Sequence, residues 1–287
     1  MNPDDPFEIE EYLNKTPRDE KSSILTREQV KLLIHDPYNV NSPVQLRQNF
    51  DEDVLDRIPI FRMLETYLEI IQREKYIELG RMGTLPPHFL VEIYDKRFIT
   101  DPLIDAGLVE WRDEGSCISI MTVHMIAIDA ELVNMTEDKL ELSLKGMQLM
   151  HPEKRNDLFV LCFKTFTDEF PWFLFDKYVE KPVASFGWAY SILMLHQQGT
   201  NFLPVTFYSG QYLHSFPKMK KYFDAFRVPL LSATACYNTR TFDFFLHWFG
   251  LIILEKAGTN NYSDKDEIKR SQIFYEVFQF AEGLGEG

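Results

Sequence analysis

The sequence is poor in cysteine, with only Cys117, Cys162 and Cys236, and these three residues lie far apart. A disulfide framework needs an even set in a short secreted chain, and a zinc site needs closely spaced pairs. Neither pattern is present. We expect all three to be buried free thiols, since free cysteine is among the most buried residue types.

Long hydrophobic runs are also missing. The longest apolar stretch, Phe242 to Leu254, includes Asp243 and His247 and is too short and too polar to cross a bilayer. The acidic first residues lack the basic and apolar regions of a signal peptide. We therefore expect a cytoplasmic protein.

Positive charge is scarce, because 30 Lys and Arg residues face 44 Asp and Glu residues and the formal net charge is −14. Such a chain repels phosphate backbones unless its cations gather on one face. The composition therefore disfavours nucleic acid and anionic membranes as partners.

Recognisable catalytic and cofactor motifs are missing as well. No two of the seven histidines are three or four residues apart, as a helical metal pair requires. Gly80 to Gly83 has the wrong spacing for a phosphate loop. Ser209-Gly210 lacks the glycine of a nucleophile elbow, because Phe207 occupies that position. We predict no catalytic, cofactor or metal residue, and a hydrolase with an unrecognised site remains an alternative.

Core-forming residues, in contrast, are plentiful: 45% of the 287 residues are hydrophobic, including 24 Phe. This length suits one large domain or two ordinary ones. Apolar residues recur at helical spacing from Ile60 to Ile71, and Thr26 precedes a short helical pattern over 27–35 as an N-cap. The stretch 153–249 is also predicted to be mainly helical.

Short strand patterns follow several of these helices. Ile77 to Gly83 and Leu140 to Gly146 both alternate apolar and polar residues, which is strand periodicity. Residues 131–135 and 140–144 are predicted to form the two strands of a hairpin, with a turn between them. A looser copy follows the helical pattern 241–248, with strands at 250–254 and 267–270, a polar tip at 256–266 and a helix at 271–280. A helix followed by a hairpin is the outline of a winged-helix unit.

We therefore predict a mainly α (α+β) fold with tandem winged-helix-like units and short hairpin wings. Residues 1–22 are predicted to form a flexible acidic arm. Residues 23–150 would hold two winged-helix-like units, and residues 151–287 would form a helical region that ends in a third.

The tract from Ile77 to Pro86, followed by Val91, Glu92 and Tyr94, resembles an uncharacterised bacterial winged-helix-like family that is sometimes associated with SEC-C motif proteins. Leu140 to Gly146 is similar to its second wing, Phe170-Pro171-Trp172 to its aromatic step, and 249–271 to its final wing. The resemblance covers about residues 25–280. Gly80 and Ser143 replace the usual threonines, and the chain has no SEC-C cysteine cluster. The resemblance implies the fold and no established activity.

Winged helices often bind DNA through the helix that precedes the wing, which needs cationic or amide side chains. Residues 118–130 contain no Lys or Arg and are expected to form a core helix. The best basic segment comprises Lys218, Lys220, Lys221 and Arg227, interleaved with aromatic residues that suit single strands. A helix with an apolar inner face explains the same spacing.

We expect a non-catalytic scaffold protein that binds an unidentified protein partner. The alternative is a nucleic-acid-binding or regulatory winged-helix protein that uses the Lys218 to Arg227 segment. No cofactor and no membrane association are expected.

Overall fold

The structure is a computed structural model that describes residues 25–176, 178, 182–223, 232–258 and 265–284. Contacts divide the chain into two compact units. Unit 1 combines Met1–Arg47 with Trp172–Gly287, and unit 2 is Gln48–Pro171. The chain thus leaves unit 1 and returns to it, whereas the sequence suggested a boundary near residue 150. The predicted arm, 1–22, lies outside the described residues.

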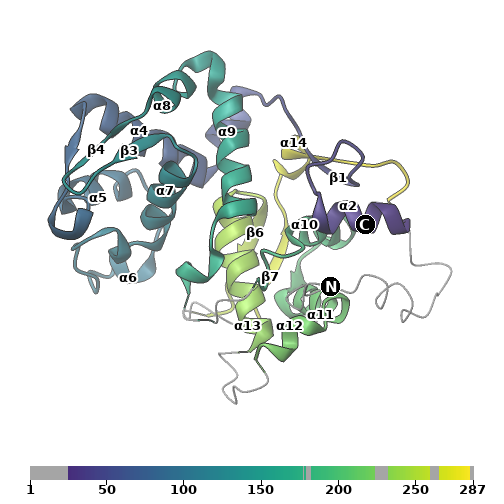
Figure 1. Ribbon diagram of the computed structural model, residues 1–287. Coiled ribbons are helices and arrows are strands. Elements are labelled where there is room, and N and C mark those ends of the chain that lie inside the picture. Colours follow the sequence, from purple (N-terminus) through teal and green to yellow (C-terminus); the bar gives the residue numbers. More distant parts are fainter. Residues whose placement is uncertain (1–24, 177, 179–181, 224–231, 259–264, 285–287) are drawn as a thin grey trace. The chain divides into compact units, whose positions relative to one another are not determined.

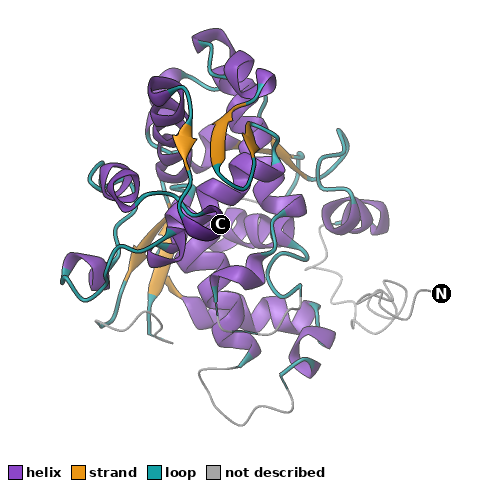
Figure 2. Cartoon of the chain, turned by 60° about the vertical axis from the view of Figure 1, so that its left-hand side comes forward, coloured by secondary structure: helices purple, strands orange, loops and turns teal. Residues whose placement is uncertain are grey.

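The prediction of a mainly helical α+β protein is confirmed. The described residues form thirteen α-helices and eight short strands, and the strands make one two-stranded and two three-stranded antiparallel sheets (Figures 1 and 2). Most of the buried apolar side chains therefore lie on helices, and the strands are short.

Unit 2 is built around α4, whose apolar residues recur at helical spacing and are buried on one side. Pro59 occupies its first turn, where the missing N–H costs nothing. The sheet of unit 2 has the strand order β2-β4-β3. The elements are α3 (Glu52–Asp56), α4 (Pro59–Glu74), β2 (Ile77–Glu78), η1 (Arg81–Gly83), α5 (Pro87–Tyr94), α6 (Pro102–Asp105), η2 (Glu114–Ser116), α7 (Ile118–Asp129), β3 (Val133–Met135), β4 (Lys139–Leu142), α8 (Leu144–Leu149), η3 (Pro152–Lys154), α9 (Arg155–Lys164) and the π-helix η4 (Thr165–Glu169).

Unit 1 has a three-stranded sheet of order β5-β7-β6 and a two-stranded sheet that joins β1 to β8. Thr26 caps α2 as predicted, and its side chain accepts from the Gln29 backbone N–H at 3.2 Å. The elements are α2 (Arg27–His35), β1 (Val44–Leu46), η5 (Trp172–Phe175), α10 (Trp188–Gln198), β5 (Leu203–Pro204), α11 (Val205–Ser215), α12 (Lys218–Lys221), α13 (Ala233–Asn238), the π-helix η7 (Thr239–Leu246), β6 (Ile252–Glu255), β7 (Glu267–Arg270), α14 (Phe274–Val277) and β8 (Phe278–Phe280).

Two sequence predictions about strands are wrong. The ribbons near residues 77 and 140 are not separate wings, because Ile77 pairs with Leu140 in one sheet. Alternation predicts a strand but not its partner. The predicted helix at 271–280 is also too long: α14 ends at Val277, and Phe278–Phe280 pair with β1.

The two three-stranded sheets have the same connectivity and the same strand register. In each unit a short strand follows a long helix, further helices intervene, and a hairpin closes the sheet with its second strand in the centre. Ile77 faces Leu140 in unit 2 as Leu203 faces Ile268 in unit 1. Both pairs are extended by a backbone bond of 2.9 Å, from Leu79 to Asp138 and from Val205 to Asp266.

The turn that leads into each hairpin is also the same. Glu131 and Gly250 adopt positive φ angles of 57° and 67° at the end of the preceding helix. The next residues, Leu132 and Leu251, donate to carbonyls five residues back at 2.8 Å, which is a Schellman turn. The same two leucines accept from Ser143 and Ser271 at 3.0 Å. The two units therefore contain one structural repeat used twice.

Candidate functional site

The helix before the hairpin of unit 2, α7, is an internal element. The prediction of a core helix is confirmed, because seven of its residues are buried and only Asp129 is exposed. A helix that is apolar all round packs inside a protein. It presents no cation that could reach a phosphate or a base edge.

The corresponding helix of unit 1 is formed by α13 and the π-helix η7. No residue of these two elements is exposed. The basic residue Arg240 is 1% exposed, and its Nε donates to Asp176 at 2.6 Å while Nη1 donates to the Val183 carbonyl at 3.2 Å. This guanidinium is a structural ion-pair partner and is not accessible to a ligand.

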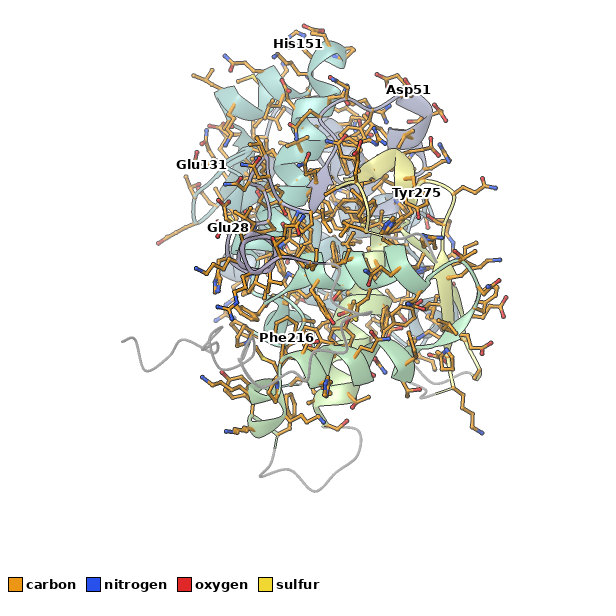
Figure 3. All side chains as sticks on the ribbon, turned by 90° about the vertical axis from the view of Figure 1, so that its right-hand side faces the viewer. Glu28, Asp51, Glu131, His151, Phe216 and Tyr275 are labelled. Atoms are coloured by element: carbon orange, nitrogen blue, oxygen red, sulfur yellow. The ribbon has the colours of Figure 1, made fainter. Side chains whose placement is uncertain are left out.

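The predicted basic segment lies on α12 and beyond it. Lys220 and Lys221 are exposed and Lys218 is half-buried, while Arg227 lies outside the described residues. Two aromatic residues that could stack on bases, Phe216 and Phe223, are buried, as is Met219. Figure 3 labels Phe216, which packs against Phe186 and Tyr190. Burial of these apolar residues in and beside the short helix α12 thus accounts for the spacing, and the lysines are left without these two rings as stacking platforms.

The candidate nucleophiles Ser209, Cys117, Cys162 and Cys236 are all buried and serve packing. Ser209 is fully buried, and its hydroxyl donates to the Val205 carbonyl within its own helix at 3.2 Å. The expectation of buried free thiols is confirmed for all three cysteines. Burial raises the pKa of Cys162 to about 12 and also raises the pKa of Cys117 and Cys236, so the reactive thiolate is suppressed.

A buried polar pair joins two helices of unit 2. The Tyr67 hydroxyl on α4 lies 2.6 Å from Nδ1 of His124 on α7. Burial lowers the pKa of His124 to about 4 and raises that of Tyr67 well above 10, so both groups stay neutral at physiological pH. Such a pair holds the two helices together.

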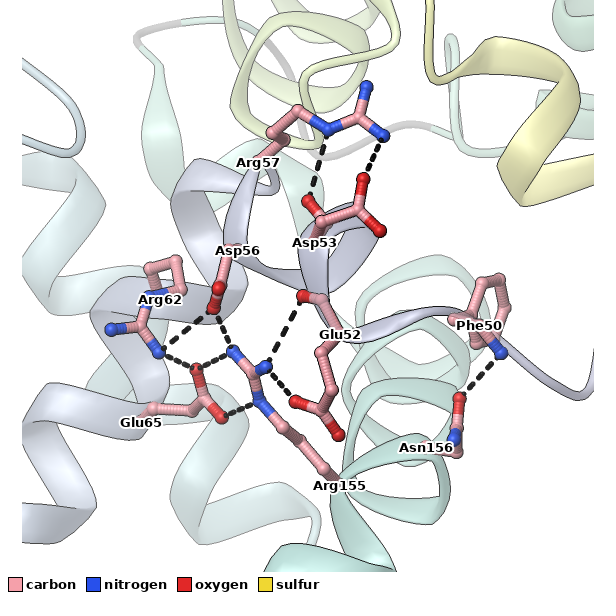
Figure 4. A network of polar contacts seen from close by, with 9 residues as sticks. All are labelled: Phe50, Glu52, Asp53, Asp56, Arg57, Arg62, Glu65, Arg155 and Asn156. Atoms are coloured by element: carbon pink, nitrogen blue, oxygen red, sulfur yellow. Dashed lines mark hydrogen bonds and ion pairs between the residues drawn. The ribbon is translucent and has the colours of Figure 1, made fainter.

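The densest ion-pair network of the described residues centres on Arg155 (Figure 4). Its guanidinium contacts Glu65 at 2.6 Å, Asp56 at 2.6 Å and Glu52. Arg62 joins the network through Glu65 at 2.5 Å. These contacts fasten α9 to α3 and α4, and they surround a pocket of about 310 Å³. Each charged group in the network has a partner of opposite charge. We therefore interpret the network as a structural clamp that holds α9 against α3 and α4.

An apolar surface follows the hairpin of unit 2. Leu144 and Met147 lie three residues apart on one side of α8 and are 76% and 44% exposed. Gly146 faces the opposite way, since a Cβ at this position would lie 2.1 Å from the Leu132 carbonyl oxygen. Close packing of α8 against this backbone therefore fixes the two apolar side chains toward solvent.

A second pocket, of about 450 Å³, lies in unit 1 beside β8. Its polar lining residues include Arg47, His196, Tyr275 and Glu282. Sequence reasoning missed this set because its members are far apart along the chain. The one signal in the sequence is His196, and its place in the last turn of α10 also suits a purely structural role.

Searches for similar proteins gave no match among family models, curated proteins or solved structures. In the described part of the chain, no helix is long and apolar enough to span a membrane. Nor do the described residues hold a cluster of three or more potential metal ligands.

Proposed function

We propose that the chain is a non-catalytic scaffold protein, in which two winged-helix-like units bind other proteins. A winged helix places one strand after its first helix and a hairpin after its third, and the strands form a small antiparallel sheet. The order β2-β4-β3 in unit 2 and β5-β7-β6 in unit 1 agrees with that plan. The proposal therefore has two such units, where the sequence suggested three.

The observation that carries this proposal is the burial of the helix before each hairpin, which is α7 in unit 2 and α13 with η7 in unit 1. In helix-turn-helix proteins this element enters the major groove and reads bases. Here α7 carries no cation and Arg240 of η7 is held by Asp176. A fold that uses its recognition helix as core has only its remaining surfaces for binding.

The surface most suited to a protein partner is the exposed side of α8. Leu144 and Met147 bring apolar area to the surface, and methionine adapts to irregular partners. Lys145 beside them lies 3.8 Å from Glu131, so the patch has a polar rim of both charges. An apolar centre with a polar rim is typical of protein interfaces.

The test compares proteins captured from native extract by the full chain and by a Leu144→Glu/Met147→Glu variant. A Val40→Glu variant is the matched control, because Val40 is an exposed apolar residue of unit 1. We expect the wild type to capture at least one protein. This protein, once purified, should bind the wild type and the Val40→Glu control with equal affinity and the α8 variant about tenfold more weakly.

Fluorescence anisotropy with single- and double-stranded DNA at low salt tests the nucleic-acid alternative. The proposal predicts that neither single-stranded nor double-stranded DNA binds the chain saturably. Saturable binding that is lost on substitution of Lys220 and Lys221 by Gln would contradict it. Failure of the α8 variant to weaken any purified partner would contradict the assigned surface.

A further inference from the structure

The pocket of about 450 Å³ in unit 1 joins segments that are distant in sequence. Arg47 follows β1, His196 lies on α10, Tyr275 lies on α14, and residues 278–284 form β8 and the segment after it. Figure 3 labels Tyr275, which contributes to the pocket wall. None of these residues belongs to the α8 surface, so the pocket is a separate feature of the chain.

Arg47 supplies a positioned cation. Its Nε donates to the Tyr275 carbonyl at 3.0 Å, which holds the guanidinium at the pocket. Within the described residues, the two Nη groups meet no protein acceptor. A guanidinium presents its N–H groups in a planar fork that matches the two oxygens of a carboxylate. Arg47 is therefore suited to a carboxylate ligand.

Glu282 supplies the opposite charge in the same pocket. Glu282 is exposed, and among the parts of the chain that the structure describes its carboxylate forms no ion pair with Arg47 or with another cation. A carboxylate accepts well from an ammonium group. One unpaired cation and one unpaired anion in a single pocket are complementary to a zwitterion.

Four of the other lining residues carry aromatic rings: His196, Tyr275, Phe278 and Phe280. The rings of His196 and Phe280 stack with centroids 3.9 Å apart, and Nδ1 of His196 lies 3.1 Å from the Tyr275 hydroxyl. Arg270 also donates to that hydroxyl, and its guanidinium lies over the Tyr275 ring. Phe278 and Leu284 also line the pocket but are 0% and 2% exposed, so the half-buried Phe280 provides most of an apolar wall. Such a wall suits the side chain of a small apolar ligand.

We propose that this pocket binds a free α-amino acid with an apolar side chain. Its carboxylate lies on Arg47, its ammonium group on Glu282, and its side chain against the ring of Phe280. The ligand is small enough for the volume, and each charged group of the lining gains a partner. No chemical step is involved, so the pocket acts as a binding site only.

The test is isothermal titration of the full chain with L-phenylalanine and L-leucine, and with two analogues that keep one charge each, phenylpropanoate and phenylethylamine. We expect one of the two amino acids to bind, and the analogues of L-phenylalanine to bind at least about tenfold more weakly, because each loses one charge-assisted contact.

Two variants assign the charges. Arg47→Gln should weaken amino acid and phenylpropanoate by about tenfold and leave phenylethylamine unchanged, and Glu282→Gln should weaken amino acid and phenylethylamine only. Arg112→Gln, which alters an exposed arginine of unit 2, is the control. Thermal unfolding verifies that each variant is folded.

Two results would overturn the proposal. One is the absence of binding by both amino acids up to about 10 mM, a concentration at which even a weak specific site is filled. The other is binding that neither the Arg47 nor the Glu282 substitution changes.

Discussion

The buried pair of Tyr67 and His124 makes the stability of unit 2 sensitive to acid. His124 is 8% exposed, and burial lowers its pKa from 6.5 to about 4. In the unfolded chain the imidazole regains its ordinary pKa and binds a proton near pH 6.5. A lowered pKa in the folded state means that the stabilising contribution is present above pH 6.5 and is lost as the pH falls toward 4.

The size of the effect follows from linkage. At pH 5 the unfolded imidazole is almost fully protonated, whereas the folded one is almost fully neutral. The free energy of unfolding of unit 2 should therefore fall by about 2 kcal/mol between pH 8 and pH 5 from this group alone. Other carboxyl and imidazole groups titrate in the same range, so the contribution must be isolated by substitution.

His124→Asn isolates it, because the amide can still accept from the Tyr67 hydroxyl but does not titrate. The assay is urea unfolding followed by circular dichroism at pH 8 and pH 5. The variant should lose about 2 kcal/mol less than the wild type over this interval. His88→Asn, at an exposed histidine of the same unit, is the control and should behave as the wild type. Identical pH dependence in His124→Asn and wild type would refute the reasoning.

Two further predictions concern packing in unit 2. Gly146→Ala places a Cβ against the Leu132 carbonyl oxygen and should lower the free energy of unfolding by about 1–3 kcal/mol, as measured by urea unfolding; an unchanged midpoint would show that α8 can move away. Arg155→Met removes a largely buried partner from Glu65 and should cost about 2 kcal/mol, whereas Arg57→Met, which breaks the exposed pair with Asp53, should cost less than about 0.5 kcal/mol. Equal losses in these two variants would contradict the assignment of Arg155 as the clamp.

Local features were predictable from the sequence where one element carries the whole signal. The stripe from Ile60 to Ile71 sets α4, and the cap at Thr26 sets α2. The hairpin at 131–144 was also predicted, because its strands are adjacent along the chain and a polar turn joins them.

Features that depend on distant residues were not predictable. The two residues of β2 carry too little pattern to reveal that Ile77 pairs with Leu140. The same holds for β8, whose alternating Phe278-Gln279-Phe280 was included in a helix although it pairs with β1. The pocket beside β8 depends on this pairing, since it brings Arg47 to the Tyr275 carbonyl. No local period contains that information.

The thiols offer a direct probe of whether the helix before the hairpin of each unit is internal. Cys117 immediately precedes α7, and Cys236 lies on α13. With Ellman's reagent at pH 8, the native protein should leave all three thiols unreacted over minutes, and urea should release all three. Rapid modification of Cys117 or Cys236 in the native protein, located by mass spectrometry, would mean that these helices lie at the surface, where a nucleic acid could reach them.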